Sequence, residues 1–529
     1  MAEIGRASAA LASGTFVSRI LGFAKIWLLV QAIGVVSLAA NAYQTATIVP
    51  NSIYAIIAQG ILNAVLIPQI VRASYNPDGG KAYINKFITL GIVIFAAIAL
   101  VATALAPVLV RLYGVSGTQA ELATTFAYWS LPQIFFFGLY SLLGEVLNAR
   151  RSFGPFTWAP VLNNIVAIAV LVLFIAIYGT HSASNPHHHW SLGMVALLAG
   201  GATAGVAAQA LILFLFWRRL GLRFRFDFHW RGVNLGSAGI AASWTFAMLL
   251  ATQLAGLVET VVANSGGPGY AGSFVMSNAW TVFMLPHGII AVSIVTAYYT
   301  RMAEHVEEKR ISDFRSDFSN AVRSIMLFIV ISSVALIVLS YPVARIFTES
   351  YHVMGNVLAA YAIGLVPFSL VFLAQRAFYA LGDTKTPFYF TLAQTILVVA
   401  LVLPCFAIAP ELRAAAIALI ISASSVFQAI LAFVLLRRKI GTVDGRKIVG
   451  GLWKFLAAGA AAAIAGLGIL VLLGGVSKGA FSVQDGLRAI AACAIVGVAM
   501  IVVYAGALLL LRSPELSNLL PRSRKTTEL

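Results

Sequence analysis

The sequence predicts an all-α polytopic membrane protein with about fourteen transmembrane helices. Its 529 residues are 60% hydrophobic and only 10% charged, and the mean hydropathy is +0.92, whereas soluble domains are far more polar. The apolar residues also gather into segments of about 20 residues or more, the length that crosses a bilayer as a helix. Composition and segment length therefore indicate the same fold class.

The apolar segments can be followed in chain order. Their approximate bounds are 14–34, 41–71, 88–113, 121–147, 156–178, 192–217, 234–263, 270–298, 321–347, 353–381, 387–409, 413–436, 452–474 and 487–511. The first is a full span without a small-residue cleavage pattern, so we expect an uncleaved anchor and no removable signal peptide.

The basic residues predict the orientation of these spans. If the N-terminus is cytoplasmic, that side receives most of the 35 Lys and Arg residues. The opposite side receives Arg111, Arg345, Arg413, Lys478 and Arg488. Cytoplasmic loops are enriched in Lys and Arg, so both termini are expected in the cytoplasm. The net charge of +17 then reflects loops that face anionic lipids, and nucleic-acid binding is not expected.

A repeated pattern predicts two pseudo-symmetric six-helix lobes followed by two extra helices. Residues 147–156 and 378–388 each join an apolar span end and an Ala to a short polar turn and a Pro-Phe pair. The copies are six spans apart, so they share an orientation, as in many transporters with internal repeats. The predicted parts are an N-terminal lobe 1–217, a linker 218–233, a C-terminal lobe 234–440, and spans 13–14 with a basic tail 441–529.

The linker alternates basic and aromatic residues over 218–231. This pattern is typical of an amphipathic segment at the membrane surface. A plain solvated linker is the alternative.

The first two spans contain polar residues that indicate a binding cavity. Arg19 and Lys25 lie in the first span, and a cation within the hydrocarbon usually faces a wet interior. The second span carries a polar stripe within an arc of about 120° on a helix. Its members are Asn41, Gln44, Thr45, Asn51, Ser52, Gln59 and Asn63. We interpret stripe and cations as a cavity for an anionic, hydrogen-bonding substrate; the alternative is amides that only join neighbouring helices.

The seventh span carries an acid, Glu259, which shares a helix face with Thr245 and Thr252 because the three are spaced by seven residues. An acid inside a transporter span is a candidate for proton or cation coupling. The alternative is a carboxylate near the outer end of the span that reaches interfacial water.

The eighth span has a polar face at Ser273, Ser277 and Thr281, and we assign Ser277 and Thr281 to the cavity. Pro286 follows and predicts a bend. His287 beside it is expected to be structural.

Two further charges lie near the cytoplasmic ends of spans four and ten, Glu145 and Arg376. Each is either a member of a gating ion pair or a charged group whose side chain extends to the membrane–water interface. The sequence leaves both alternatives open.

The sequence contains no constellation that predicts catalysis. It shows no nucleophile–base arrangement, phosphate-binding Gly-rich loop or metal-ligand spacing, so we expect no enzyme, cofactor or metal site. Cys405 and Cys493 lie inside apolar spans, and His187, His188 and His189 are adjacent in an external loop. Transport would then draw on an ion gradient or the membrane potential.

Several motifs together resemble the MurJ (MviN) family. They are 18–23 (SRILGF), 49–51 (VPN), Gln59-Gly60 with Pro68, 147–149 (LNA), 159–164 (APVLNN) and 376–387 (RAFYALGDTKTP). The resemblance covers most of the chain in the right order.

The resemblance implies a lipid II flippase of the bacterial cytoplasmic membrane. It implies two lobes that open alternately around a cationic cavity, a fold similar to multidrug and oligosaccharidyl-lipid exporters, and a groove for the lipid tail at spans 13 and 14. The substrate would be undecaprenyl-pyrophosphate-linked peptidoglycan precursor, moved from the cytoplasmic to the outer leaflet. Membrane lipids and cell-wall synthesis enzymes would be its partners.

The chain departs from the family pattern at charged positions. Lys25-Ile26 replaces an Arg-Asp pair in the first span, and neutral residues occupy other charged positions of the pattern. These are Asn41, Tyr54, Ala55, Gln59 and Thr281. Lys can hold a phosphate as a point charge but lacks the bidentate fork of Arg. The alternatives are export of another polyprenyl-linked glycan or a small amphiphile, and a non-transporting cell-wall scaffold.

Overall fold

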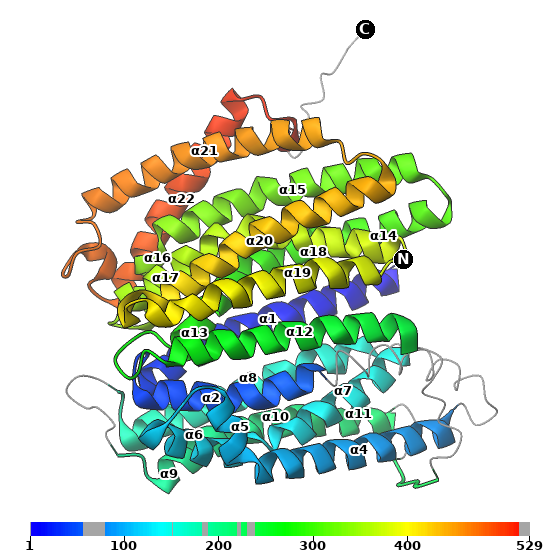
Figure 1. The fold of residues 1–529 in the computed structure, drawn as a ribbon, viewed down its shortest axis with the longest axis vertical. Coiled ribbons are helices and arrows are strands. Elements are labelled where there is room, and N and C mark those ends of the chain that lie inside the picture. The colour runs from blue at the N-terminus through cyan, green and yellow to red at the C-terminus, as the bar shows by residue number, and fades with distance from the viewer. Residues whose placement is uncertain are drawn as a thin grey trace. The chain divides into compact units, whose positions relative to one another are not determined.

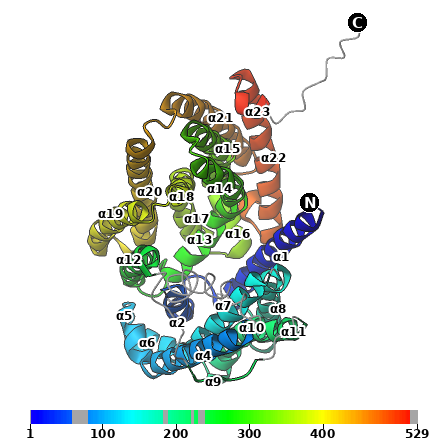
Figure 2. The same ribbon diagram turned by 90° about the vertical axis from the view of Figure 1, so that its right-hand side faces the viewer.

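The computed structural model describes residues 2–56, 80–150, 152–181, 189–219, 224–229 and 239–517. Throughout these residues the backbone is helical or irregular, without a β-strand. The chain forms two compact units, Met1–Phe274 and Val275–Leu529. Within each unit the long helices run side by side (Figures 1 and 2).

The first unit begins with a long helix, and shorter helices follow it along the chain. They are α1 (Ala2–Ile33), α2 (Leu38–Tyr54), α4 (Lys81–Ala104), α5 (Ala106–Leu112), α6 (Gly117–Ser130), α7 (Gln133–Ala149), α8 (Phe153–Tyr178), α9 (Leu192–Val195), the π-helix η2 (Ala196–Gly200), α10 (Gly201–Leu211), α11 (Leu213–Arg219) and α12 (Gly239–Asn264). Helix α1 packs along α8, α8 packs on α10, and α2 packs on α6.

The second unit begins within α13 and contains the remaining helices. They are α13 (Ser273–Pro286), the π-helix η3 (His287–Ala291), α14 (Val292–Glu307), α15 (Ile311–Val338), α16 (Ser340–Phe347), α17 (Tyr351–Ile363), α18 (Leu365–Ala380), α19 (Lys385–Val402), the 3-10 helix η4 (Leu403–Ala407), α20 (Pro410–Ile440), α21 (Gly445–Leu472), the 3-10 helix η5 (Phe481–Val483), α22 (Gly486–Leu510) and α23 (Pro514–Ser517). Helix α15 packs on α21, and α21 packs on α22.

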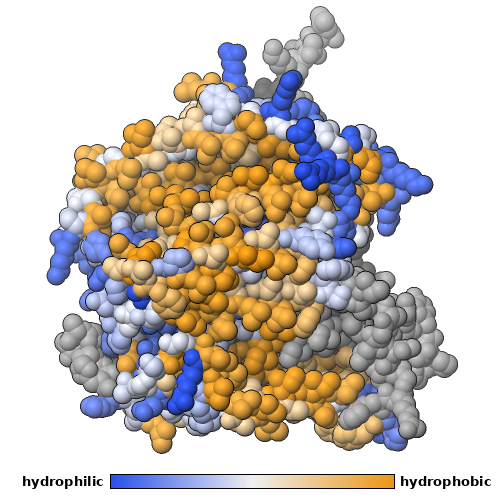
Figure 3. Space-filling view, viewed as in Figure 1, coloured by the Kyte–Doolittle hydropathy of each residue, from blue (hydrophilic) through white to orange (hydrophobic). Residues whose placement is uncertain are grey.

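The described helices match thirteen of the fourteen predicted spans. Twelve helical segments are long and apolar enough to cross a membrane, and α17 with α18, bent by 47°, makes a thirteenth. The predicted span 41–71 begins as α2, and residues 57–79 lie outside the described part. Apolar side chains dominate over the middle of the helices in Figure 3, and hydrophilic ones gather near their ends. The predicted all-α polytopic membrane fold is confirmed.

Two helices of the second unit begin or end away from their predicted bounds. The predicted span 270–298 continues as α14 to Glu307, and the predicted span 321–347 begins ten residues earlier, at Ile311. Both extensions are polar, and they pack on each other, so tertiary contacts stabilise helix where hydropathy alone ends the span. Directly after Pro286 the helix continues as the π-helix η3, and the bend expected at this proline stays a prediction.

Two cations assigned to the external side are structural. Arg413 is only 7% exposed, and its guanidinium donates hydrogen bonds to the carbonyls of Cys405, Phe406 and Ile408 at 2.9 to 3.0 Å. Arg345 donates in the same way to the carbonyls of Val483 and Gln484. Helix ends leave such carbonyls without partners, so these cations stabilise chain reversals there.

The described part of the linker is extended. Residues 224–229 lie along α4, where the backbone N–H groups of Arg225 and Asp227 donate to the side chains of Asn85 and Thr89. Phe226 and Phe228 are about 60% exposed and stack on each other at 6.1 Å. The placement of this segment at the membrane surface stays a prediction, as do the lobe boundaries at 217, 233 and 440.

Candidate substrate-binding residues

The first predicted cations, Arg19 and Lys25, lie on α1 and have half-buried side chains. Within the described residues, neither cation forms an ion pair or a hydrogen bond. Buried cations are normally paired. Two unpaired cations in one apolar helix therefore point to an anionic ligand or to water in their surroundings.

Two of the sequence motifs, 18–23 and 159–164, meet where α1 packs on α8. Asn164 of α8 donates a hydrogen bond from Nδ2 to the carbonyl of Ser18 at 2.8 Å, and a second to the Ser18 hydroxyl at 3.2 Å. The neighbouring Asn163 donates to Gln209 Oε1 of α10 at 3.0 Å. The asparagine pair thus links α8 to α1 and to α10, and it holds the backbone next to Arg19.

The N-terminal part of the polar stripe on α2, with Asn41 and Thr45, packs against other segments of the first unit. Asn41 is 3% exposed and its Oδ1 accepts a hydrogen bond from the N–H of Phe274 at 3.3 Å. A Cβ on Gly272 would lie 2.4 Å from the same oxygen, so only glycine fits this approach. Asn264 bridges Thr45 and the carbonyl of Tyr113. In this conformation Asn41 and Thr45 therefore take part in hydrogen bonds between different segments of the first unit, and their assignment to a substrate cavity stays a prediction.

Other residues of the polar stripe on α2 are more exposed to solvent. Gln44 and Ser52 are half-buried, and Asn51 is exposed and donates to the carbonyl of Thr47 one turn earlier. Tyr54 bonds to the hydroxyl of Ser141 on α7 at 2.6 Å and stacks on Phe137. The last two stripe residues, Gln59 and Asn63, lie outside the described residues.

The predicted residues of spans seven and eight lie on α12 and α13. Glu259 of α12 is half-buried, and its carboxylate has no hydrogen bond or ion pair within the described part of the chain. Ser277 and Thr281 are half-buried on α13, and the Thr281 hydroxyl donates to the Ser277 carbonyl at 2.9 Å. His287 is 4% exposed and bonds through Nδ1 to Ser369, which agrees with the structural role expected for it.

The structure adds a polar face that the sequence prediction omitted. Ser293, Thr296 and Thr300 on α14 are exposed, and each hydroxyl donates to a carbonyl one turn earlier. Their spacing of three and four residues places them on one face. The sequence shows this spacing, but the three residues lie in and next to a predominantly apolar segment, so hydropathy did not single them out.

The turn between α18 and α19 is stabilised by Asp383. The Asp383 carboxylate accepts hydrogen bonds from the backbone N–H groups of Lys385 and Thr386 and from the Thr386 hydroxyl. Lys439 of α20 forms an ion pair with it. Burial alone would raise the pKa of Asp383, but these hydrogen bonds outweigh it and hold that pKa below its usual value. The 376–387 motif thus starts α19 and joins it to α20.

This fold, with buried polar residues inside long apolar helices, is that of a polytopic helical membrane protein. A family model described as "Lipid II flippase MurJ" matches residues 29–492. The chain belongs to the MurJ family.

Individual relatives agree with this assignment. The chain is 24% identical to a probable lipid II flippase MurJ of Rickettsia prowazekii over 413 residues, which cover 74% of this chain and 76% of the relative. It is 26% identical to a probable lipid II flippase MurJ of Haemophilus influenzae over 402 residues, 70% of this chain and 75% of the relative.

Solved structures show the same fold. The structure of lipid II flippase MurJ in an inward closed conformation matches with a TM-score of 0.71 at 19% identity, covering 94% of this chain and 99% of the other. An inward-facing multidrug resistance MATE family transporter of the MOP superfamily matches with a TM-score of 0.58 at 16% identity, covering 81% and 99%.

Proposed function

We propose that this protein is a lipid II flippase that moves the undecaprenyl-pyrophosphate-linked peptidoglycan precursor to the outer leaflet by alternating access. Membership of the MurJ family supports the substrate class. The observation that carries the proposal is that two cations on α1, Arg19 and Lys25, have no ion pair or hydrogen bond among the residues that the structure describes. A pyrophosphate needs cations, and Arg offers a planar fork that bonds two phosphate oxygens at once.

The neutral residues at other charged family positions are compatible with this role. Asn41 bonds the Phe274 N–H, Tyr54 bonds Ser141, and Thr281 bonds a carbonyl of its own helix. Each of these three side chains therefore has a hydrogen-bond partner in this structure without a charge partner. Substrate charge would then be held by Arg19, with Lys25 as a weaker point charge, and hydrogen bonds would come from Gln44, Asn51, Ser52, Gln59, Asn63 and Ser277.

Both termini are assigned to the cytoplasm of a bacterium, since most Lys and Arg then lie on that side. Glu259 is the candidate for ion coupling because its half-buried carboxylate lies inside a predicted span. Cell-wall synthesis enzymes are proposed partners, and the basic loops are the surfaces that would receive them.

A second candidate function is export of another polyprenyl-linked glycan or a small amphiphile. The replacement of family charges by Asn41, Tyr54 and Thr281 favours it, because a less cationic site discriminates less strongly for pyrophosphate.

Complementation tests the proposal. The chain is expressed in a bacterium whose own lipid II flippase can be switched off, beside an Arg19→Ala variant of equal membrane abundance. Growth restored by the unaltered chain and not by Arg19→Ala is the expected result. No growth with either chain, at good membrane abundance, would contradict lipid II as the substrate and favour the second candidate.

A further inference from the structure

The guanidinium of Arg376, near the end of α18, is surrounded by aromatic rings. Its central carbon lies 5.2 Å from the ring centroid of Phe372, 5.8 Å from that of Tyr299 on α14 and 5.9 Å from that of Tyr379. Helices α14 and α18 pack on each other within the second unit. A cation within about 6 Å of a ring centroid is attracted by the π-electrons of that ring.

The charge of Arg376 is not balanced by a carboxylate. Within the described residues it forms no ion pair or hydrogen bond, whereas other cations of the second unit do. Arg301 pairs with Asp317 at 2.9 Å, Arg323 pairs with Glu515 at 2.9 Å, and Lys439 pairs with Asp383. The rings compensate part of the lost hydration of Arg376, but they accept none of its N–H groups in the way that an anion does.

The hydrogen-bond donors around this cation are available as well. Aromatic contacts use the π-face or the carbon edge of a ring, and they leave the in-plane N–H groups of a guanidinium for acceptors. The phenol hydroxyls of Tyr299 and Tyr379 have no hydrogen-bond partner in the part of the chain that the structure describes. All three side chains are half-buried. The cluster therefore offers positive charge together with O–H and N–H donors, and among the described residues no carboxylate pairs with it.

The depth of the cluster suits a lipid headgroup. Arg376 lies four residues before the end of α18 at Ala380, and the polar turn 381–384 follows. The ends of predicted membrane spans are expected at the level of the lipid headgroups. From charge, donors and depth we propose that Arg376, Tyr299 and Tyr379 bind the phosphate group of a lipid headgroup, at a site separate from Arg19 and Lys25.

Two lipids carry this chemistry, an anionic phospholipid of the membrane and a polyprenyl pyrophosphate of the substrate class. Binding of each is measured on the purified full chain by native mass spectrometry, with phosphatidylglycerol, undecaprenyl pyrophosphate and zwitterionic phosphatidylcholine as probes. The variant is Arg376→Gln. The matched control is Arg438→Gln, an exposed arginine at the end of α20 that loses the same charge.

We expect Arg376→Gln to weaken binding of at least one anionic probe about tenfold, because the variant loses the positive charge and its charge-assisted hydrogen bonds to the phosphate. Arg438→Gln should change it less than about twofold, as expected for a screened surface charge. Loss confined to phosphatidylglycerol identifies a phospholipid site, and loss confined to the pyrophosphate identifies a substrate site. The proposal would be overturned if Arg376→Gln bound each anionic probe as tightly as the wild type does. It would also be overturned if Arg376→Gln and Arg438→Gln lost the same amount of binding.

A Tyr299→Phe/Tyr379→Phe double variant keeps the rings and removes the hydroxyls, so it tests the site even if Arg376→Gln does not fold. It should lower binding of the same probe, and unchanged binding would overturn the role of the two tyrosines. The site does not depend on the proposed lipid II function. If complementation failed while phosphatidylglycerol binding stayed intact, the proposed lipid II function would be contradicted and the lipid site at Arg376 would be retained.

Discussion

The side chain of Asn164 on α8 donates a hydrogen bond to the backbone carbonyl of Ser18 on α1 at 2.8 Å. Two motifs that are far apart in the sequence, 18–23 and 159–164, therefore meet in the fold. The bond lies one residue from Arg19, so it fixes the helix that presents this cation. A motif that looks functional in the sequence acts here by positioning another.

Asn164→Ala should lower stability and activity together. Loss of a hydrogen bond to a half-buried carbonyl costs about 1 kcal/mol or more, and α1 gains freedom beside Arg19. The melting temperature of the purified protein and complementation measure the two effects. Ser18→Ala is the matched control, because it removes the weaker 3.2 Å bond and keeps the carbonyl. Equal behaviour of both variants and wild type would contradict the positioning role.

Asp383 should contribute stability that depends on pH. Its pKa is below the usual value in the folded protein, so its contribution is present above the unfolded pKa of about 4 and is lost as the pH falls through the lower folded pKa. Asp383→Asn keeps an acceptor for the N–H of Thr386 but removes the charge that pairs with Lys439. The difference in melting temperature between wild type and Asp383→Asn should shrink from pH 6 to pH 3. A constant difference would show that the carboxylate charge does not matter.

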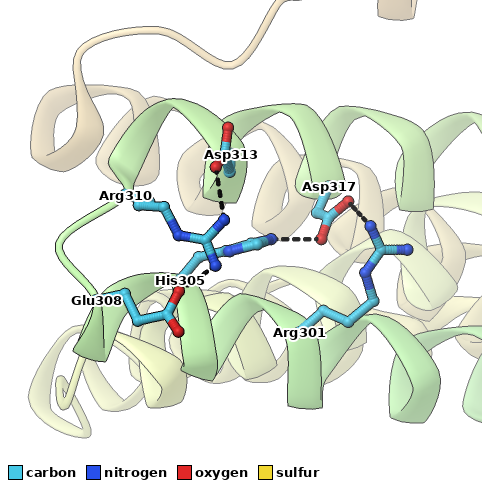
Figure 4. A network of polar contacts seen from close by, with 6 residues as sticks. All are labelled: Arg301, His305, Glu308, Arg310, Asp313 and Asp317. Carbon is cyan, nitrogen blue, oxygen red and sulfur yellow. Dashed lines mark hydrogen bonds and ion pairs between the residues drawn. The ribbon is translucent and has the colours of Figure 1, made fainter.

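A buried carboxylate joins the polar extensions of α14 and α15 (Figure 4). Asp317 is 4% exposed, and its oxygens accept from Arg301 at 2.9 Å and from His305 Nε2 at 3.1 Å. Asp317→Asn leaves one of these donors without an acceptor and should cost about 2 kcal/mol. The exposed Asp313, which pairs with Arg310, is the control, since surface pairs contribute about 0–1 kcal/mol. Chemical unfolding of Asp317→Asn and Asp313→Asn compares them, and equal losses would be inconsistent with this assignment.

Glu259→Gln should separate coupling from binding. The substitution keeps the size of the side chain and removes its charge, so substrate binding is retained while the dependence of transport on an imposed ion gradient or potential falls. Glu121→Gln on α6 is the control, because Glu121 is exposed in the same unit. Transport by Glu259→Gln that responds to gradients and potential as wild type does would remove Glu259 from the mechanism.

Hydropathy was sufficient for the fold class and for nearly all spans, because burial in lipid requires long apolar helices whatever their tertiary contacts. It could not predict the polar extensions that begin α15 at Ile311 and end α14 at Glu307. These turns are stabilised by contacts such as Asp317 with Arg301, which join residues of two helices.

The candidate site was harder to predict for a related reason. A polar stripe shows which residues share a helix face, but not which face meets protein. Asn41 and Gln44 look equivalent in the sequence, yet Asn41 accepts a hydrogen bond from the Phe274 N–H, whereas the half-buried Gln44 side chain forms no hydrogen bond within the described residues. The aromatic surroundings of Arg376 likewise arise from two helices that the sequence does not place together.

A direct transport assay tests the central claim, that Arg19 and Lys25 bind the pyrophosphate of a lipid that the protein moves across the membrane. The purified chain is reconstituted in vesicles with fluorescent lipid II, and the probe that becomes accessible on the opposite leaflet is followed in the wild type, Arg19→Ala, Lys25→Ala and the double variant. The account predicts transport by the wild type, partial transport by Lys25→Ala and none by Arg19→Ala. Transport by the double variant at the wild-type rate would contradict it.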